Sequence, residues 1–293
     1  MTIDPQRLLA REFAPVEHAY TSRDTILYAL GAGVGADPLD AGQLRYVYER
    51  APGGLQALPT LANVLGYGGF WADQPDTGIT WRQLVHAEQA IELHRPVPAE
   101  GRVVGVNRVL ALHDKGAAKG ALMVQERSVR DASTGETLVT ITQTSMLRGD
   151  GGFGGSHGAP LAPPHTVPER AADAVCDLAT LPQAALLYRL NGDYNPLHAD
   201  PEVARAAGFS RPILHGLATM GVAMHAVLRS VLDYEASLVR GMRVRFTAPV
   251  LPGETLRTEL WVDGCVISLR TSVPARNAVV LNGGRVDLHR PPR

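Results

Sequence analysis

The chain has 293 residues, enough to bury a sizeable core, and at about 100–200 residues per domain this length predicts two domains. With 28 Lys and Arg against 29 Asp and Glu, the formal net charge of -1 gives no bulk electrostatic reason to expect nucleic acid or an anionic membrane as a partner. The two cysteines, Cys176 and Cys265, match neither a disulfide framework nor a metal-ligand spacing. The charged start and the lack of an apolar run of about 18 residues argue against a secretory signal and a membrane span, so we expect a cytoplasmic protein.

The first half of the chain indicates one helix followed by several strands. Residues 23–31 are typical of a helix. Strand-like stretches follow at 43–48, 83–93, 101–112, 121–130 and 137–147.

A conspicuous break lies near the middle, where residues 149–158 contain six glycines and a proline-rich stretch follows. We therefore expect a first domain at 1–148, a Gly/Pro-rich linker at 149–168 and a second domain at 169–293. A phosphate-binding loop is the weaker interpretation of the glycines, because the terminal Gly-Lys-Ser/Thr is missing.

The second half repeats the order of helix and strands more clearly. Apolar residues recur at helical spacing over 213–232, and alternating stretches follow at 242–248, 255–262, 265–273 and 278–288. A long helix followed by antiparallel strands predicts an α+β domain in which one face of the sheet covers the helix.

One loop of this half has the composition of a reactive turn. Gly192 permits unusual backbone angles, and Pro196 disfavours a helical conformation at Asn195, so the side chains of Asp193 and His198 are expected to converge. After the loop, Asp200 is the predicted N-cap of a short helix that Gly208 ends.

An Asp and a His that converge beside a helix start suit the hydration of an activated double bond. One water held between Asp193 and His198 would be oriented or deprotonated by the carboxylate, and the imidazole would protonate the substrate carbon. The N–H of Gly216, where the long helix begins, would stabilise an enolate oxygen. Two simpler interpretations compete: Asn195 and Pro196 only form a turn, or His198, Asp200 and His215 bind a metal, which we do not expect because no Cys or Glu completes the set.

The residues of this loop resemble a known family. YRLNGDYNPLHADP from Tyr188 and AGFSRPILHGL from Ala207 are similar to the signature of MaoC-like hydratase 2 enzymes, in particular the hydratase part of peroxisomal multifunctional enzyme type 2. The similarity extends over nearly the whole chain, through YVYE from Tyr46, HAEQAIELHRPVP from His86, DKG at 114–116, GGFGG at 151–155 and RVRFTAPVLPGETL from Arg243.

The resemblance implies a double hotdog, two antiparallel sheets each wrapped around a long helix. It also implies hydration of trans-2-enoyl-CoA to (3R)-3-hydroxyacyl-CoA, with no cofactor and no metal. Asp193 and His198 are then the catalytic pair, Asn195 positions them, and the Gly216 N–H forms the oxyanion site.

The resemblance further implies a set of positions that contact acyl-CoA, with Lys115 a chemically sensible partner for a phosphate. Glu49 matches an acidic position with a functional or supporting role. The family usually has glycine where this chain has Ala87, which puts ligand fit or chain-length preference in question. The ligand-contacting positions are His86, Ala87, Lys115, Tyr194 and Phe246.

Three other functions remain open. A (3R)-hydroxyacyl-thioester dehydratase would run the same chemistry in reverse, on CoA or on a carrier protein. A non-catalytic acyl-CoA binding protein would not need the acid–base pair, and a thioesterase fits the loop less well. Paired hotdog domains often associate further, so a homodimer is compatible with the sequence.

The two halves differ at the reactive loop, which predicts one active site per chain. Aligning Tyr20 with Tyr188 places Asp24 opposite Asp193 but Ala29 opposite His198. We expect the first half to accommodate the acyl tail, with Leu65 or Phe70 limiting the chain length.

Overall fold

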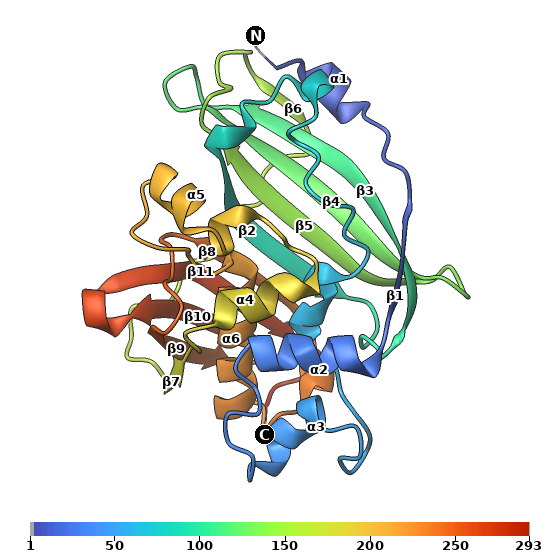
Figure 1. Cartoon of the computed structure of the whole chain (residues 1–293), viewed down its shortest axis with the longest axis vertical. Coiled ribbons are helices and arrows are strands. Elements are labelled where there is room, and N and C mark those ends of the chain that lie inside the picture. Colours follow the sequence, from blue (N-terminus) through green and yellow to red (C-terminus); the bar gives the residue numbers. More distant parts are fainter. Residues whose placement is uncertain (1–2, 293) are drawn as a thin grey trace.

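The computed structural model describes residues 3–292, and these residues form one antiparallel sheet with helices against it (Figure 1). Hydrogen-bonded neighbours follow the order β1-β3-β4-β5-β2-β8-β11-β10-β9-β7, and β6 pairs with β3. The strands are β1 (Val16–Tyr20), β2 (Leu84–Leu93), β3 (Gly101–Asp114), β4 (Ala121–Asp131), β5 (Thr137–Leu147), β6 (Ser156–Gly158), β7 (Ala174–Ala179), β8 (Val239–Phe246), β9 (Thr255–Asp263), β10 (Val266–Val273) and β11 (Ala278–Leu288).

The helices are mostly short, and α6 is the longest of them. The α-helices are α1 (Pro5–Leu9), α2 (Ser22–Gly31), α3 (Ala41–Val47), α4 (Ala184–Tyr188), α5 (Pro201–Ala206) and α6 (Gly216–Ser230). The 3₁₀ helices are η1 (Pro59–Val64), η2 (Pro75–Thr77), η3 (Trp81–Gln83), η4 (Arg189–Asn191), η5 (Pro196–His198), η6 (Ala236–Leu238) and η7 (Pro274–Arg276). Across residues 3–292, no helix combines the length and the apolar character that crossing a membrane requires.

The two halves of the sheet join at its centre. Strand β2 of the first half pairs with β8 of the second, with Gln89 opposite Val244 and Glu92 opposite Gly241. The two sheets that the resemblance implied are therefore one continuous sheet, which curves around the helices (Figure 1).

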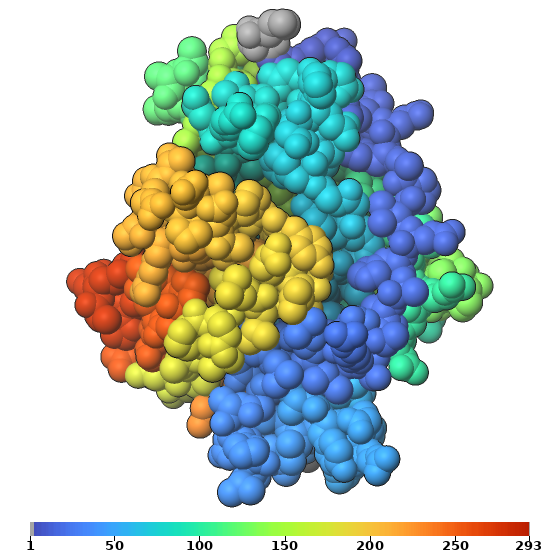
Figure 2. Space-filling view, viewed as in Figure 1, coloured from blue at the N-terminus to red at the C-terminus, as the bar shows by residue number. Residues whose placement is uncertain are grey.

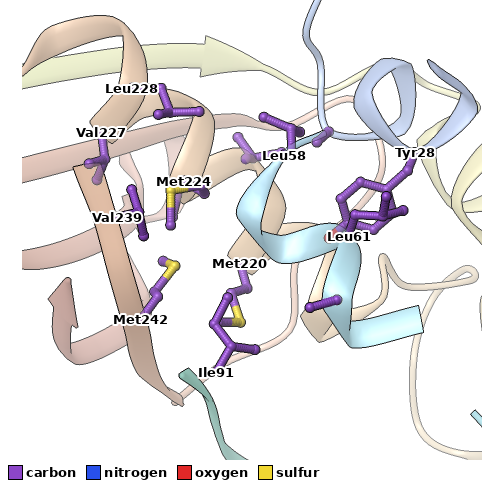
Figure 3. Close-up of a cluster of buried hydrophobic side chains, with 14 of the residues drawn as sticks. Tyr28, Leu58, Leu61, Ile91, Met220, Met224, Val227, Leu228, Val239 and Met242 are labelled. Atoms are coloured by element: carbon purple, nitrogen blue, oxygen red, sulfur yellow. The ribbon is translucent and has the colours of Figure 1, made fainter. Parts of the chain in front are cut away.

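Helix α6 forms the centre of the hydrophobic core, and all of its residues from 218 to 228 are buried. Met220 and Met224 lie among inward-facing strand residues such as Ile91 and Met242 (Figure 3). The predicted helix at 213–232 is confirmed with slightly shorter ends. A helix buried on all sides needs apolar residues around its whole circumference, and the strand alternation supplies the matching apolar face.

Between residues 3 and 148 the structure contains no helix as long as α6. Helix α2 confirms the expectation at 23–31, and η1 packs against α6 in place of a second long helix. The predicted strand at 43–48 is wrong, because residues 41–47 form α3. Asp40 caps this helix by accepting hydrogen bonds from the N–H groups of Gly42 and Gln43, and the Tyr46 hydroxyl donates to the Tyr234 carbonyl at 2.7 Å.

The internal alignment of Tyr20 with Tyr188 is also wrong, because Tyr20 lies in strand β1 and Tyr188 in helix α4. The order of elements instead matches β1 with β7 and α2 with α4. These two helices pack together, with the rings of Tyr28 and Tyr188 5.8 Å apart. The asymmetry between the halves remains, since no histidine occurs between His18 and His86.

The glycine-rich segment is packed rather than extended. The Asp114 carboxylate accepts hydrogen bonds from the N–H groups of Gly116, Gly152 and Gly154, and the adjoining β6 pairs with β3. These hydrogen bonds lower the pKa of Asp114. Residues 149–158 therefore lie on the first half of the chain, and residues 159–173 make the crossing to the second half.

Candidate active site

The loop between η4 and α5 brings Asp193 and His198 together with His215. A carboxylate oxygen of Asp193 and one ring nitrogen of each histidine lie within 4.8 Å of one another. Gly192, at φ 108°, turns the chain before Asp193 in a conformation that glycine adopts most readily. The structure thus brings together the two residues that the sequence selected, and adds a third.

The turn itself is built by Asn195. Its side-chain Oδ1 accepts a hydrogen bond from the Leu197 N–H at 3.0 Å, and its own N–H donates to Asp193 Oδ1 at 3.3 Å. Asp200 then caps α5 by accepting from the Glu202 N–H at 2.8 Å, as predicted, so the loop is fixed on both sides of His198. Asn195 is exposed, and its contacts fit a positioning role.

His198 is held in one tautomer. Its Nδ1 lies 2.8 Å from the carbonyl oxygen of Ile213, and because a carbonyl only accepts, Nδ1 carries the proton. The side chain is buried, with 8% of its surface exposed. Burial lowers the pKa of His198, whereas the Ile213 carbonyl and Asp193 act in the opposite direction. The ring is therefore neutral at pH 7, and Nε2 remains a proton acceptor.

His215 supports the other two residues from behind. Its ring stacks on His198 with centroids 3.7 Å apart, and its Nε2–H donates to the Asp193 carbonyl at 3.2 Å. Burial and the neighbouring His198 lower its pKa to about 4, so it stays neutral. His215 thus bonds to the backbone of the loop.

The long helix α6 starts beside this cluster. Gly216 is its first residue, and the first N–H groups of a helix have no acceptor within it. The ring of Phe246 covers Gly216 so closely that an added Cβ would lie 3.1 Å from Phe246 Cε1. His86 packs edge-on against the same ring, with centroids 4.8 Å apart. Gly216, Phe246 and His86 therefore form a contiguous wall.

The structure contains a buried network of hydrogen bonds next to His86 that the sequence did not predict. His86 Nε2 donates to Gln89 Oε1 at 3.0 Å, and Gln89 Nε2 donates to Asn63 Oδ1 at 2.8 Å. Arg127 donates to the Asn63 carbonyl at 2.5 Å, and burial lowers the pKa of Arg127 to about 10, where it remains charged at pH 7. Gln89 belongs to the HAEQ motif, but Asn63 and Arg127 are too distant in sequence to be recognised.

Ala87 lies at a β-bulge, where the pairing of β2 with β5 shifts between His86 and Glu88. The non-glycine residues with positive φ in the described part of the chain are Asp233, Tyr234 and Asn277, so the backbone at Ala87 is open to any residue. Alanine in place of the family's glycine therefore introduces no backbone strain.

Lys115 is exposed in the β3–β4 hairpin, at the same end of the sheet as His86. The pairing register connects the two places, since Ala121 lies opposite Leu147 and Leu147 opposite Leu84. Strands β4 and β5 lie between β3 and β2, so three strand spacings of about 4.8 Å separate the strands that lead to Lys115 and hold His86.

The remaining two predicted positions differ from each other. Tyr194 projects from the reactive loop with 57% of its surface exposed, and the Arg189 guanidinium lies 4.9 Å from its ring centroid. Glu49 lies in an exposed turn after α3, a helix that packs against α2. The structure does not place Glu49 with the Asp193 cluster.

A cavity of about 290 Å³ adjoins the loop on the side of the first half. Figure 2 shows the yellow segment that contains the loop lying against the blue and cyan first half. Leu65 lines this cavity, whereas Phe70 does not and packs against Trp81 instead. Partial burial and the nearby Asp193 raise the pKa of Tyr67, another lining residue, to about 12. The cavity is lined by Val16, Glu17, His18, Tyr20, Asp24, Leu61, Val64, Leu65, Tyr67, Leu190, Asn191 and Gly192.

The residues that could bind a metal differ from the set that the sequence suggested. Asp200 is engaged as a helix cap, and Asp193 takes its place beside His198 and His215. In each histidine one ring nitrogen already donates to a backbone carbonyl. The absence of a metal requirement stays a prediction.

Comparison with known proteins divides the chain at the same place as the glycine-rich break. Residues 18–149 match the MFE-2 hydratase 2 N-terminal domain family, and residues 163–282 match the MaoC like domain family.

Several relatives match almost the whole chain, and three of them are 39–41% identical to it. The peroxisomal enoyl-CoA hydratase 2 of Arabidopsis thaliana is 39% identical over 94% of this chain and 93% of its own length. A protein of Mycobacterium tuberculosis named enoyl-CoA hydratase ChsH3 is 41% identical over 97% of this chain and 98% of its own length. A second protein of that organism, named 3-hydroxyacyl-thioester dehydratase Y, is 40% identical over 98% of this chain and 99% of its own length.

A crystal structure described as a MaoC-like dehydratase from Phytophthora capsici has the same architecture. It aligns with a TM-score of 0.86 at 32% identity, and covers 97% of this chain and 98% of the other. The fold is thus the α+β double hotdog that the resemblance implied. The chain belongs to the hydratase 2 family of MaoC-like proteins.

Proposed function

We propose that this protein catalyses the reversible syn hydration of trans-2-enoyl-CoA to (3R)-3-hydroxyacyl-CoA. The observation that supports this most directly is the convergence of Asp193 and neutral His198 beside the first N–H groups of α6. Relatives at 39% and 41% identity over nearly the whole chain are named enoyl-CoA hydratases, which fits the same chemistry.

His198 carries out both proton transfers of the reaction. Its unprotonated Nε2 accepts a proton from water as the water oxygen bonds to Cβ of the substrate, and the π electrons move to the thioester oxygen. The enolate then collapses, and Cα takes the same proton back from Nε2. Because one residue on one face handles both steps, H and OH add to the same side of the alkene.

Asp193 orients the water and stabilises the transient imidazolium. Its carboxylate attracts the protonated form of His198, and this attraction is already evident as an upward effect on the histidine pKa. His215 holds the loop at the Asp193 carbonyl, so the carboxylate stays aligned during the proton transfers.

The enolate oxygen is stabilised at the start of α6. The Gly216 N–H points out of the helix where its dipole is positive, which suits a developing negative charge. A single donor of this kind typically contributes about 2.7–4 kcal/mol to the transition state. His86 and Phe246 form the adjacent wall against which the thioester lies.

The remainder of the substrate extends in two directions from the reacting carbons. Lys115, at the same end of the sheet as His86, attracts a phosphate of CoA. The cavity beside Leu65 and Gly192 receives the acyl tail, so the first half contributes binding and the second half contributes chemistry. This division gives one active site per chain, and calorimetric titration with decenoyl-CoA is expected to give one ligand per chain.

Dehydration of a (3R)-hydroxyacyl thioester is the same reaction in reverse. One relative of nearly equal similarity is named a dehydratase, so the direction in the cell follows from supply and removal of the two thioesters. A cytoplasmic location is part of this proposal and a homodimer is compatible with it, whereas several relatives, including that of Arabidopsis thaliana, are named as peroxisomal. Cell fractionation and light scattering test these two points.

The test is a hydration assay with crotonyl-CoA and decenoyl-CoA, followed at the absorbance of the conjugated thioester. His198→Gln removes the proton carrier, and Asp193→Asn removes the negative charge that stabilises the imidazolium. Both substitutions change the side-chain volume little, and we expect turnover to fall by about 10²–10⁴-fold in each variant. Asp200→Asn is the matched control, because asparagine also caps helices well. Near-normal turnover of either site variant, or a (3S) product on chiral analysis, refutes the proposal.

A further inference from the structure

A second cleft, of about 540 Å³, lies on the face of the sheet opposite α6. Strands β2, β5, β8 and β11 line it, together with residues 163–166 of the segment that crosses between the halves. Small residues explain the hollow: Ala90 lies opposite both Thr142 of β5 and Arg243 of β8, and Gly241 follows along β8. Nothing in the proposed reaction uses this cleft.

Arginines of two adjacent strands lie side by side in the lining of this cleft. Arg243 of β8 and Arg285 of β11 are directly opposite in the pairing register, an arrangement that costs free energy for two like charges. Arg285 donates to Asp287 at 2.6 Å, and Arg240 lies 3.7 Å from the same carboxylate. Within residues 3–292, Arg243 has no carboxylate within 4.0 Å, so its charge is uncompensated.

The position of this pair depends on a local irregularity in β11. The pairing with β8 shifts between Asn282 and Arg285, where Gly283 has φ 56°. A Cβ on Gly283 would lie 2.8 Å from the carbonyl oxygen of His165, so only glycine lets the crossing segment pass this close. The bulge thus brings His165 to the edge of the cleft, where its Nε2 lies 2.8 Å from Ser268 Oγ.

We propose that this cleft binds a small ligand with two or more phosphate groups, with Arg243 as its principal cation. Guanidinium groups match phosphate oxygens in a planar, two-pronged geometry, and two such groups on adjacent strands suit two neighbouring phosphates. The volume is in the range of small-molecule sites, roughly 300–1,000 Å³. Glu92 and Asp287 also line the cleft, so three arginines face two carboxylates, and the remaining positive charge favours a compact anion over an extended acidic surface.

The test is calorimetric titration of the full-length protein with inorganic pyrophosphate and, separately, with ATP, at low salt. We expect one ligand per chain, and Arg243→Gln weakens binding by about tenfold or more. Arg245→Gln is the matched control, because Arg245 lies two residues further on the same face of β8, pairs with Glu88 at 2.8 Å and lies outside the cleft. Circular dichroism melting checks that both variants are folded.

A third variant separates this cleft from the candidate active site. Lys115→Gln is expected to leave pyrophosphate binding unchanged, since Lys115 lies in a different hairpin. Tighter binding of ATP than of pyrophosphate identifies a nucleotide, and equal binding identifies a diphosphate alone. No binding of either probe, equal losses in the Arg243 and Arg245 variants, or a loss that follows Lys115 overturns the proposal.

Discussion

Replacing Gly216 with proline tests the oxyanion N–H with little disturbance of the helix. His215 has φ −58° and ψ 138°, an extended conformation that the residue before proline prefers. Proline is also tolerated at the first helical position, because the N–H it removes has no acceptor inside the helix. The hydrogen bond from the Thr219 N–H to the His215 carbonyl, 3.1 Å long, does not involve the replaced group.

The close contact with Phe246 requires a second variant. Any residue other than glycine places a Cβ 3.1 Å from Phe246 Cε1 and 3.2 Å from Cδ1, so the ring must shift by a few tenths of an ångström. Gly216→Ala causes this shift but keeps the N–H, whereas Gly216→Pro causes it and also removes the N–H. The ratio of the two turnover numbers therefore isolates the hydrogen bond.

The expected ratio follows from the strength of a single oxyanion donor. About 2.7–4 kcal/mol corresponds to roughly 10²–10³ in rate, at 1.36 kcal/mol for each factor of ten. Hydration of crotonyl-CoA measures it, because that short substrate does not depend on the tail cavity. If the folded proline and alanine variants have equal turnover, the Gly216 N–H is not the donor.

The other predictions concern His198, the tail cavity and metals. Burial lowers the pKa of His198 below its ordinary 6.5, and the neutral ring is the active form. We therefore expect kcat/KM to fall only as the pH drops through that lowered pKa. A midpoint above pH 6.5 in the profile of kcat/KM would contradict this. Leu65→Trp narrows the cavity, so we expect the ratio of kcat/KM for decenoyl-CoA to kcat/KM for crotonyl-CoA to fall by about tenfold or more. Phe70 lies outside the cavity, so Phe70→Trp leaves this ratio unchanged. Equal effects of the two substitutions would argue against the cavity as the site of the acyl tail. Dialysis against EDTA leaves turnover unchanged, and a loss that zinc restores would establish a metal at Asp193, His198 and His215.

Patterns within single elements were predictable from the sequence. The apolar spacing over 213–232 and the alternation over 242–248 correspond to α6 and β8, because burial on one side or all sides leaves a direct trace in residue order. Turn chemistry was equally clear, since Gly192, Pro196 and Asp200 each restrict the backbone locally.

Short elements and long-range contacts were not predictable. Residues 43–48 alternate in the manner of a strand, but the Asp40 cap and the buried Tyr46 stabilise a helix, and a run of this length fits either period. The buried hydrogen-bond network next to His86 depends on three elements that meet only in the folded protein. It links Arg127, Asn63, Gln89 and His86. No pattern along the sequence encodes such a contact.

The pairing of β2 with β8 has a consequence for how the protein comes apart. Both strands are interior, so separating the halves would expose two long edges with unpaired N–H and C=O groups and would uncover Ile91 and Met242. A fragment that ends near residue 148 would also lose α6, around which its own inner face packs. The two family segments are therefore halves of one cooperative unit, and a chain cut at the glycine-rich break would aggregate through these edges unless the halves found each other first.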